Sequence, residues 1–300
     1  MNRNGVIAVL CAILWILSAC STPEFGFERD GQEIEFVERD GQEIEFERDG
    51  RDYIESTRQK YEVDPGGTLA IVAAELGSIH IRSSINNEVD VLVRKRLRET
   101  DADRVRKAFS NVEVEIKETY NGVRIEVDQI RNVTYKRWFW QDWPDRVTVD
   151  IEVLVPVEYN LDLSTIIGDI QTGNIAGNVT AKTLSGNVST GPTEGDLSIK
   201  TNSGNIETGR VVGKVHTITL SGNTEVIGPV DGDVTIRSNS GRIETRTIDG
   251  DLQAKSLTGR IKIGPVDGDA TVHSNSGDIR TGNVQGKLKA TTLIGNITNR

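Results

Sequence analysis

Glycine recurs at intervals of nine residues through the second half of the chain. The spacing holds in two runs, separated by one extra residue: Gly168, Gly177, Gly186, Gly195, Gly204, Gly213 and Gly222, then Gly232, Gly241, Gly250, Gly259, Gly268, Gly277, Gly286 and Gly295. A short period kept over so many copies is typical of stacked repeats. The spacing therefore predicts a chain of small coils, each in contact with its neighbours alone.

The nine-residue units are of two alternating kinds. One kind, such as GDLSIKTNS at residues 195–203, has apolar residues at its third and fifth positions and Thr or Ser at its seventh. The other kind, such as GNIETGRVV at residues 204–212, has Ile or Val third and mostly Thr fifth. Apolar residues at every second position predict strands with one buried face, and Gly suits the corner between strands.

One strand and one corner per nine residues predict two sides per eighteen-residue coil, with coils stacked at roughly 4.8 Å. The predicted fold class is all-β, a parallel β-solenoid with nine-residue, Gly-punctuated half-coils. A longer rhythm leaves a four-sided, thirty-six-residue coil open as the alternative. Leu and Asn alternate before one corner, and the pairs Gly191-Pro192, Gly228-Pro229 and Gly264-Pro265 recur at about that spacing. We favour eighteen residues, because a four-sided coil with so few large apolar residues would be hollow.

Residues 1–20 resemble a bacterial lipoprotein signal peptide. A basic residue precedes an apolar stretch at 6–17, and Leu-Ser-Ala-Cys at 17–20 resembles the lipobox. The resemblance implies that Cys20 becomes the first mature residue and carries the lipid that holds the protein on the membrane. Ser21 follows Cys20, and the absence of Asp at this position resembles lipoproteins sent to the outer membrane. An ordinary signal peptide or a short membrane anchor is the alternative.

Residues 21–60 predict an acidic tether. The segment ERDGQEIEF occurs at 28–36 and again at 38–46, and its first residues return at Glu47. An acidic tandem repeat with few large apolar groups is typical of a solvated spacer. The alternation within Gln-Glu-Ile-Glu-Phe also permits a hairpin around Asp-Gly.

Residues 61–300 form the predicted solenoid domain, with an irregular first part at 61–160 and regular repeats at 161–300. Strands are expected in the first part at 68–74, 78–82, 89–95, 112–116, 123–127 and 147–155. One short helix is expected at 101–109, capped by Thr100 or Asp101.

The composition narrows the classes of partner. A formal net charge of −10 and a sequence pI near 5.0 argue against nucleic acid. Cys11 leaves with the signal peptide and Cys20 is consumed by lipid, so no disulfide or thiolate metal site is expected. The three histidines are scattered, and the Gly-Gly-x-Gly-x-Asp motif of calcium-binding β-rolls does not occur. We therefore predict neither a metal nor a cofactor.

Three segments carry a family resemblance. VTVDIEVLVP at 147–156, LDLST at 161–165 and GDI at 168–170, followed by the Ser-Gly repeats, resemble the bacterial putative-adhesin family of β-strand-repeat domains, whose function is not established. The same region, 61–300, is similar to the head domains called GIN. The resemblance implies a right-handed β-helix-like domain, often exported, with no established catalytic residues.

An aromatic segment at 135–143 is the first candidate binding site. It contains Trp138, Phe139, Trp140 and Trp143 between two strand segments, so it predicts a loop. Flat apolar side chains beside basic ones can bind sugars, proteins or a membrane interface. The alternative is a cap over the open end of the solenoid.

The second candidate is a column of basic residues. The sixth position of the first kind of unit holds Lys182, Lys200, Ile218, Arg237, Lys255, His273 and Thr291. Stacked like charges repel one another, so the column would favour an anionic polymer. The alternative is a solvated face, offset by nearby carboxylates: Asp196, Asp233, Asp251 and Asp269.

Together these patterns predict a non-catalytic, lipid-anchored protein of the cell envelope that acts as a binding or adhesin-like module, with an envelope glycan or protein as its partner. An envelope scaffold or a stress-associated accessory protein is the alternative. A polysaccharide-degrading β-helix enzyme is disfavoured, because the corners are too short to build a catalytic groove. The orientation, toward the surface or the periplasm, stays open.

Overall fold

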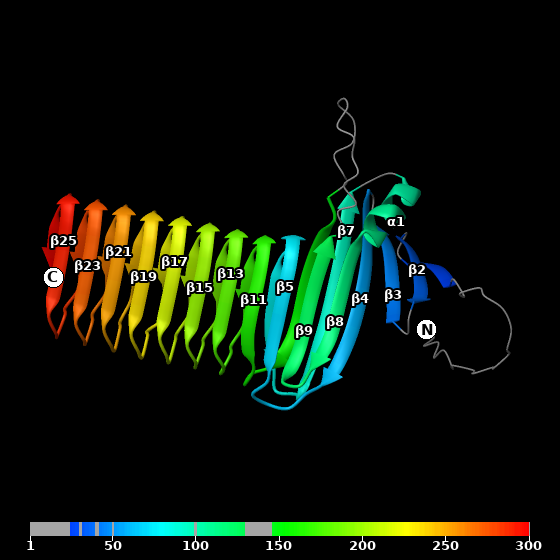
Figure 1. Ribbon diagram of the computed structural model, residues 1–300, viewed down its shortest axis with the longest axis horizontal. Helices are drawn as coiled ribbons and strands as arrows, with labels where there is room; N and C mark the ends of the chain where they lie inside the picture. Colours follow the sequence, from blue (N-terminus) through cyan, green and yellow to red (C-terminus); the bar gives the residue numbers. More distant parts are fainter. Residues whose placement is uncertain are drawn as a thin grey trace, which may run out of the picture.

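The computed structural model describes residues 25–29, 32–39, 42–49, 51–98, 101–129 and 146–299. Two β-sheets form most of the molecule. A 15-stranded sheet has the order β1-β2-β3-β4-β7-β10-β6-β12-β14-β16-β18-β20-β22-β24-β26, and an 11-stranded sheet has the order β25-β23-β21-β19-β17-β15-β13-β11-β5-β9-β8. Strands of the second sheet follow one another as a continuous row from β25 at one end to β8, with helix α1 near the N-terminal end (Figure 1). The predicted all-β solenoid class is confirmed.

The repeats supply one long and one short strand per coil. The long strands are β11 (Asn160–Ile167), β13 (Val179–Ser185), β15 (Leu197–Ser203), β17 (Val215–Ser221), β19 (Val234–Ser240), β21 (Leu252–Thr258), β23 (Ala270–Ser276) and β25 (Leu288–Ile294). The short strands are β12 (Ile170–Thr172), β14 (Val188–Thr190), β16 (Ile206–Thr208), β18 (Thr224–Val226), β20 (Ile243–Thr245), β22 (Ile261–Ile263), β24 (Ile279–Thr281) and β26 (Ile297–Asn299). All neighbouring pairs within each of these two series are parallel.

The coil is eighteen residues long, as predicted. Leu197 pairs with Val179 on one side and Val215 on the other. The thirty-six-residue alternative is wrong, because the residues that repeat over two coils lie outside the core and do not change the path of the chain.

The expectation of two sides per coil is wrong. After each short strand from β12 to β24 the chain makes a further one-residue parallel bridge to the next coil. These bridges run through Ile175, Thr193, Val211, Val230, Ile248, Val266 and Val284. The coil therefore has three sides, of seven residues, three residues and one residue. Six of the seven bridging side chains are buried, and Val284 is half-buried.

Buried hydroxyls of the long strands bond to the corner glycine of the preceding coil. Thr201 is fully buried and donates a hydrogen bond to the carbonyl oxygen of Gly186 at 3.2 Å. Thr183 and Thr219 do the same toward Gly168 and Gly204. Ser274 and Thr292 make the equivalent bond, whereas the hydroxyls of Ser238 and Ser256 are buried without a partner. Because a buried hydroxyl without a partner is costly, the bond accounts for Thr or Ser at the seventh position in five of the seven coils.

Asn and Asp side chains bridge successive coils at the corners. The Oδ1 atom of Asn178 accepts a hydrogen bond from the backbone N–H of Asp196 at 2.8 Å, and Oδ1 of Asp196 accepts one from the N–H of Lys214 at 2.8 Å. A second ladder at the corner before the short strands links Asp169, Asn187, Asn205, Asn223 and Arg242 in the same way. The Asn or Asp of these Gly-Asn and Gly-Asp pairs thus accepts a hydrogen bond from an exposed backbone N–H group at the corner of the next coil.

The irregular first part uses the same two sheets. Strand β5 (Thr68–Leu76) pairs in parallel with β11, and β6 (Ile79–Ser84) pairs with β12, so β5 and β6 form the first coil. The chain then leaves the solenoid through five elements before it returns: β7 (Glu88–Arg98), α1 (Ala102–Ser110), β8 (Val112–Thr119), β9 (Gly122–Gln129) and β10 (Thr148–Pro156). Strand β9 pairs with β5, and β10 inserts between β6 and β7.

Helix α1 begins as the sequence predicts. Oδ1 of Asp101 accepts hydrogen bonds from the N–H groups of Asp103 and Arg104, as an N-cap residue does. Val105 and Phe109 are buried in the core cluster. The helix thereby contributes apolar side chains to the N-terminal end of the solenoid core.

The segment predicted as a tether contains strands. Strands β1 (Phe25–Arg29), β2 (Gln32–Arg39), β3 (Gln42–Asp49) and β4 (Asp52–Glu62) pair antiparallel in succession, which fits the hairpin alternative. Strand β4 crosses the expected boundary at residue 60 and pairs along its whole length with β7. The polar alternation of this segment suits a sheet with one solvated face.

Candidate functional site

The outer face of the 11-stranded sheet carries the basic column. Lys182 pairs with Lys200, Ile218 stands between Lys200 and Arg237, and Arg237 pairs with Lys255. Each lies between two inward-facing residues of its strand, so its side chain is on the outer face. The predicted stacking of these cations is confirmed.

The basic column is almost without acidic partners. Lys182 has its nearest carboxylate, Asp162, at 4.0 Å. Among the residues that the structure describes, Lys200, Arg237 and Lys255 have no carboxylate oxygen within 4.0 Å. The cations thus form two pairs, Lys182 with Lys200 and Arg237 with Lys255, each pair about 4.8 Å apart on adjacent strands, in a chain of net charge −10.

The corner carboxylates bond to the backbone of the next coil. Oδ1 of Asp251 accepts a hydrogen bond from the N–H of Asp269 at 2.8 Å, and Oδ1 of Asp233 accepts one from the N–H of Asp251 at 3.2 Å. Asp196 and Asp269 bond in the same way to the next coil. These groups lie at the corner, where they stabilise coil stacking, and they make no ion pair with the basic column.

A second column lies two residues further along the strands. It consists of Leu184, Asn202, Leu220, Asn239, Leu257, Asn275 and Leu293, and the pairing of the residues on either side places them in register. We call it the leucine–asparagine column. Leu184, Leu220 and Leu257 are each about half exposed, at 51%, 46% and 48%. The sequence showed the alternation of Leu and Asn, but the pattern was interpreted as evidence on coil length, so its position beside the basic column was missed.

Strand β17 forms the apolar centre of this face. It presents His216, Ile218 and Leu220 on its outer side, where neighbouring strands present one cation each. Lys200 lies on one side of Ile218 and Arg237 on the other. The face is therefore apolar in the middle and positive on both flanks.

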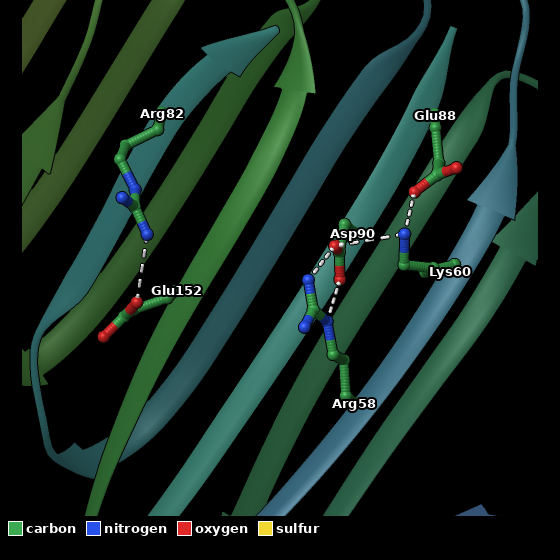
Figure 2. Close-up of polar contacts among 6 residues, drawn as sticks. All are labelled: Arg58, Lys60, Arg82, Glu88, Asp90 and Glu152. Carbon is green, nitrogen blue, oxygen red and sulfur yellow. Dashed lines mark hydrogen bonds and ion pairs between the residues drawn. The ribbon is translucent and has the colours of Figure 1, made fainter. Parts of the chain in front are cut away.

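The outer face of the other sheet carries a cluster of ion pairs on β4, β6, β7 and β10 (Figure 2). Asp90 receives hydrogen bonds from Nε and Nη2 of Arg58 at 2.8 and 2.5 Å, and Lys60 lies 3.5 Å from the same carboxylate. Lys60 also donates to Glu88 at 2.7 Å. The hydrogen bond from Arg58 lowers the pKa of Asp90, and its attraction to Arg58 and Lys60 acts in the same direction, against the effect of burial.

Every charge named in this cluster lies in an ion pair, unlike most of those in the basic column. Glu152 contacts Arg82 at 3.4 Å and also pairs with Arg94. Asp90, with a side chain only 9% exposed, is covered by its two cations. Paired carboxylates and cations that link adjacent strands are typical of a structural network, so we assign this cluster a structural role.

The remaining candidates were tested only in part. Cys20 and the aromatic residues Trp138, Phe139, Trp140 and Trp143 lie outside the described residues. In the described parts of the chain, no group of three or more His, Cys, Asp or Glu residues is placed to hold a metal ion. No helix in those parts combines the length and the apolar character that crossing a membrane requires.

Comparison with known proteins yields structural likenesses alone. No family model and no curated protein matches the chain. A solved structure named "putative adhesin" from Bacteroides fragilis NCTC 9343 is 15% identical, with a TM-score of 0.44 over 82% of this chain and 97% of its own. A "putative lipid binding protein" from Parabacteroides distasonis ATCC 8503 is 14% identical, with a TM-score of 0.46 over 82% and 96%.

A third likeness, a "putative adhesin" from Parabacteroides merdae ATCC 43184, is 10% identical, with a TM-score of 0.43 over 82% of this chain and 96% of its own. Two of the three names agree with the resemblance found in the sequence motifs. Identities and TM-scores this low carry no argument about ligand or activity.

Proposed function

We propose that this protein is a lipid-anchored, non-catalytic binding module of the cell envelope, and that it binds an anionic partner on the outer face of the 11-stranded sheet. The observation that carries the proposal is the basic column. Three of its four cations lack a carboxylate within 4.0 Å among the described residues, although the chain as a whole is acidic.

The physical reason is the repulsion within the column. Like charges directly opposite each other on neighbouring strands destabilise a sheet. The chain is acidic overall, but the positions next to these cations on the face hold Ile218 and the uncharged leucine–asparagine column in place of Asp or Glu. A polyanion laid along the column would replace repulsion by attraction and release counterions.

Retention of envelope material on the immobilised protein tests this proposal. Residues 20–300 keep every described residue in place and are used for all variants. Replacing Lys182, Lys200, Arg237 and Lys255 by Gln should abolish the salt-sensitive part of retention. The matched control replaces four cations of other sides of the coil, Arg210, Arg246, Lys262 and Arg280, by Gln.

Both variants change the net charge by the same amount, so a nonspecific charge effect would reduce retention equally. Equal loss in the two variants would contradict the assignment of the binding face. Full retention by the first variant would contradict it as well.

The aromatic segment is proposed as an accessory contact. Trp is enriched where proteins bind partners, and Trp138, Trp140 and Trp143 gather in one nine-residue segment. Each Trp→Ala variant should keep its melting temperature and lose retention. A loss of about 3–5 kcal/mol in stability with retention intact would instead identify a packing role.

A further inference from the structure

We propose, as an extension that rests on the proposed function, that the partner is an extended acidic polysaccharide with a two-sugar repeat, which lies along the solenoid axis across strands β13 to β21. The two columns of the face supply the argument, because they have different periods.

The basic column has the period of one coil. Its members follow one another at about 4.8 Å, and the span from Lys182 to Lys255 covers four coil steps, or about 19 Å. Ile218 interrupts the column at its centre, so its cations lie at the first, second, fourth and fifth of these positions. In a linear chain of sugar acids each ring bears a carboxylate, and every second ring turns its carboxylate to the same edge. The carboxylates on that edge match Lys200 and Arg237, which lie two coil steps, about 9.6 Å, apart.

The leucine–asparagine column has the period of two coils, about 9.6 Å. In an extended β-linked glycan, successive rings are turned over relative to each other, so the same edge faces one side at every second sugar. The length of a disaccharide is similar to two coils. Leucine can then contact the C–H face of one ring while asparagine bonds to the hydroxyl edge of the next.

The asparagines of the column have hydrogen-bonding capacity to spare. Among the described residues, the side-chain amides of Asn202 and Asn239 have no hydrogen-bond partner. Asn275, at the far end, is already bonded through Oδ1 to His273 at 3.0 Å. The free amides therefore lie in the same coils as Lys200 and Arg237, on either side of β17.

The centre of the face suits a sugar ring. Ile218 and Leu220 of β17 lie beside each other on the outer face, and Lys200 and Arg237 flank Ile218. A ring seated here would place its apolar face on the two aliphatic side chains and its neighbours' carboxylates next to the two cations.

A lipid surface fits these observations less well. Interfacial binding requires continuous apolar surface that enters the acyl boundary. Here every second position of the leucine–asparagine column is an amide, and the leucines are only half exposed. A protein partner is also disfavoured, because protein interfaces are anchored by aromatic side chains in pockets, and neither column contains an aromatic residue other than His273.

Binding of defined oligosaccharides to residues 20–300 tests the inference. The probe is a series of β-1,4-linked oligomannuronates of increasing length. Neutral β-1,4-manno-oligosaccharides of the same lengths test the need for the carboxylates, and vesicles that contain phosphatidylglycerol test the lipid alternative. We expect affinity for the oligomannuronates to rise with length and to level off once the chain spans Lys182 to Lys255, with no binding of the neutral series.

Two variants separate the roles of the columns. The first replaces Lys182, Lys200, Arg237 and Lys255 by Gln; it should weaken binding by about tenfold or more and reduce its salt dependence. The second replaces Leu184, Leu220 and Leu257 by Asn, which equivalent positions already tolerate in alternate coils. It should weaken binding by about tenfold with the salt dependence unchanged, because it removes apolar contact and no charge.

The outcomes distinguish the two proposals. If envelope material is retained through the basic column but no oligomannuronate binds, the polysaccharide inference is overturned and the proposed function stands. If the vesicles bind and the Leu→Asn variant releases them, the partner is a lipid surface. If the Leu→Asn variant binds oligomannuronates as tightly as the original chain, the two-sugar register is overturned. Absence of any retention overturns both proposals.

Discussion

Substitution of Gly222 by Ala should weaken the solenoid far more than the same change at Gly173. Gly222 lies at the corner between β17 and β18 with φ +144°, and a Cβ there would meet the carbonyl oxygen of Gly204 at 2.0 Å. At Gly173 the nearest atoms to a Cβ are the backbone N of Ser83 at 3.5 Å and Cα of Arg82 at 3.6 Å, which is ordinary contact.

Two costs add at Gly222. A non-glycine residue at this φ costs about 1–3 kcal/mol in backbone strain. The added Cβ meets backbone atoms of Gly204, which cannot turn away as a flexible side chain could, so the coils must move apart. Overpacking of this kind costs about 1–3 kcal/mol more. At about 2–4 °C per kcal/mol for a domain of this size, a loss of about 2–6 kcal/mol lowers the melting temperature by roughly 4–24 °C. Ala at Gly173 should leave the melting temperature within a few degrees.

Circular dichroism measures the two melting temperatures, and amide hydrogen exchange locates the damage. Because each coil contacts only its neighbours, faster exchange in the Gly222 variant should concentrate in β15 to β20. Equal melting temperatures for the two variants would refute the coil separation from which the clash is derived. Uniformly faster exchange along the whole solenoid would refute the nearest-neighbour account of its stability.

Three further predictions follow from single side chains. Ile199→Asp should cost several kcal/mol, because this position is 1% exposed and faces the core, whereas Lys200→Asp should change the melting temperature little; equal losses would reject the strand phase. Since Arg58 lowers the pKa of Asp90, the pair stabilises the fold above the unfolded-state pKa of about 3.9, and the contribution is lost as the pH falls through the lower folded-state value. The melting temperature of the original chain should therefore exceed that of Arg58→Gln near neutral pH, and the difference should shrink below about pH 4; a difference that grows on acidification would contradict the assignment. Cys20→Ala should leave the precursor unprocessed or release the protein from membranes, and unchanged membrane fractionation and processing would reject lipidation.

Only part of the candidate face on the 11-stranded sheet could be predicted from the sequence. The basic column could be predicted, since its members hold the same position in every unit of the first kind. The absence of ion pairs along the column could not be predicted. Asp196 and Asp251 are close to the column in sequence, but their side chains accept hydrogen bonds from the backbone of the next coil at the corner. Whether a corner Asp pairs with a cation of the column depends on the direction of its side chain, and the repeat pattern does not give that direction.

The sequence by itself determined the coil. Its length, strand phase and corner glycines follow from a period of nine residues, because every coil makes the same contacts with its neighbours and the pattern is repeated until it is unambiguous. The cap of α1 at Asp101 was also readable, because capping is local.

Only the tertiary structure decided how the irregular first part of the chain is attached to the regular coils. The first coil, β5 and β6, is separated in sequence from its neighbours β11 and β12 by the excursion through β7, α1, β8, β9 and β10. Strand β4 pairs with β7 across the boundary expected for a tether. These contacts occur once each and join distant segments, so no periodicity marks them; they form because the exposed strand edges of the first coil need partners.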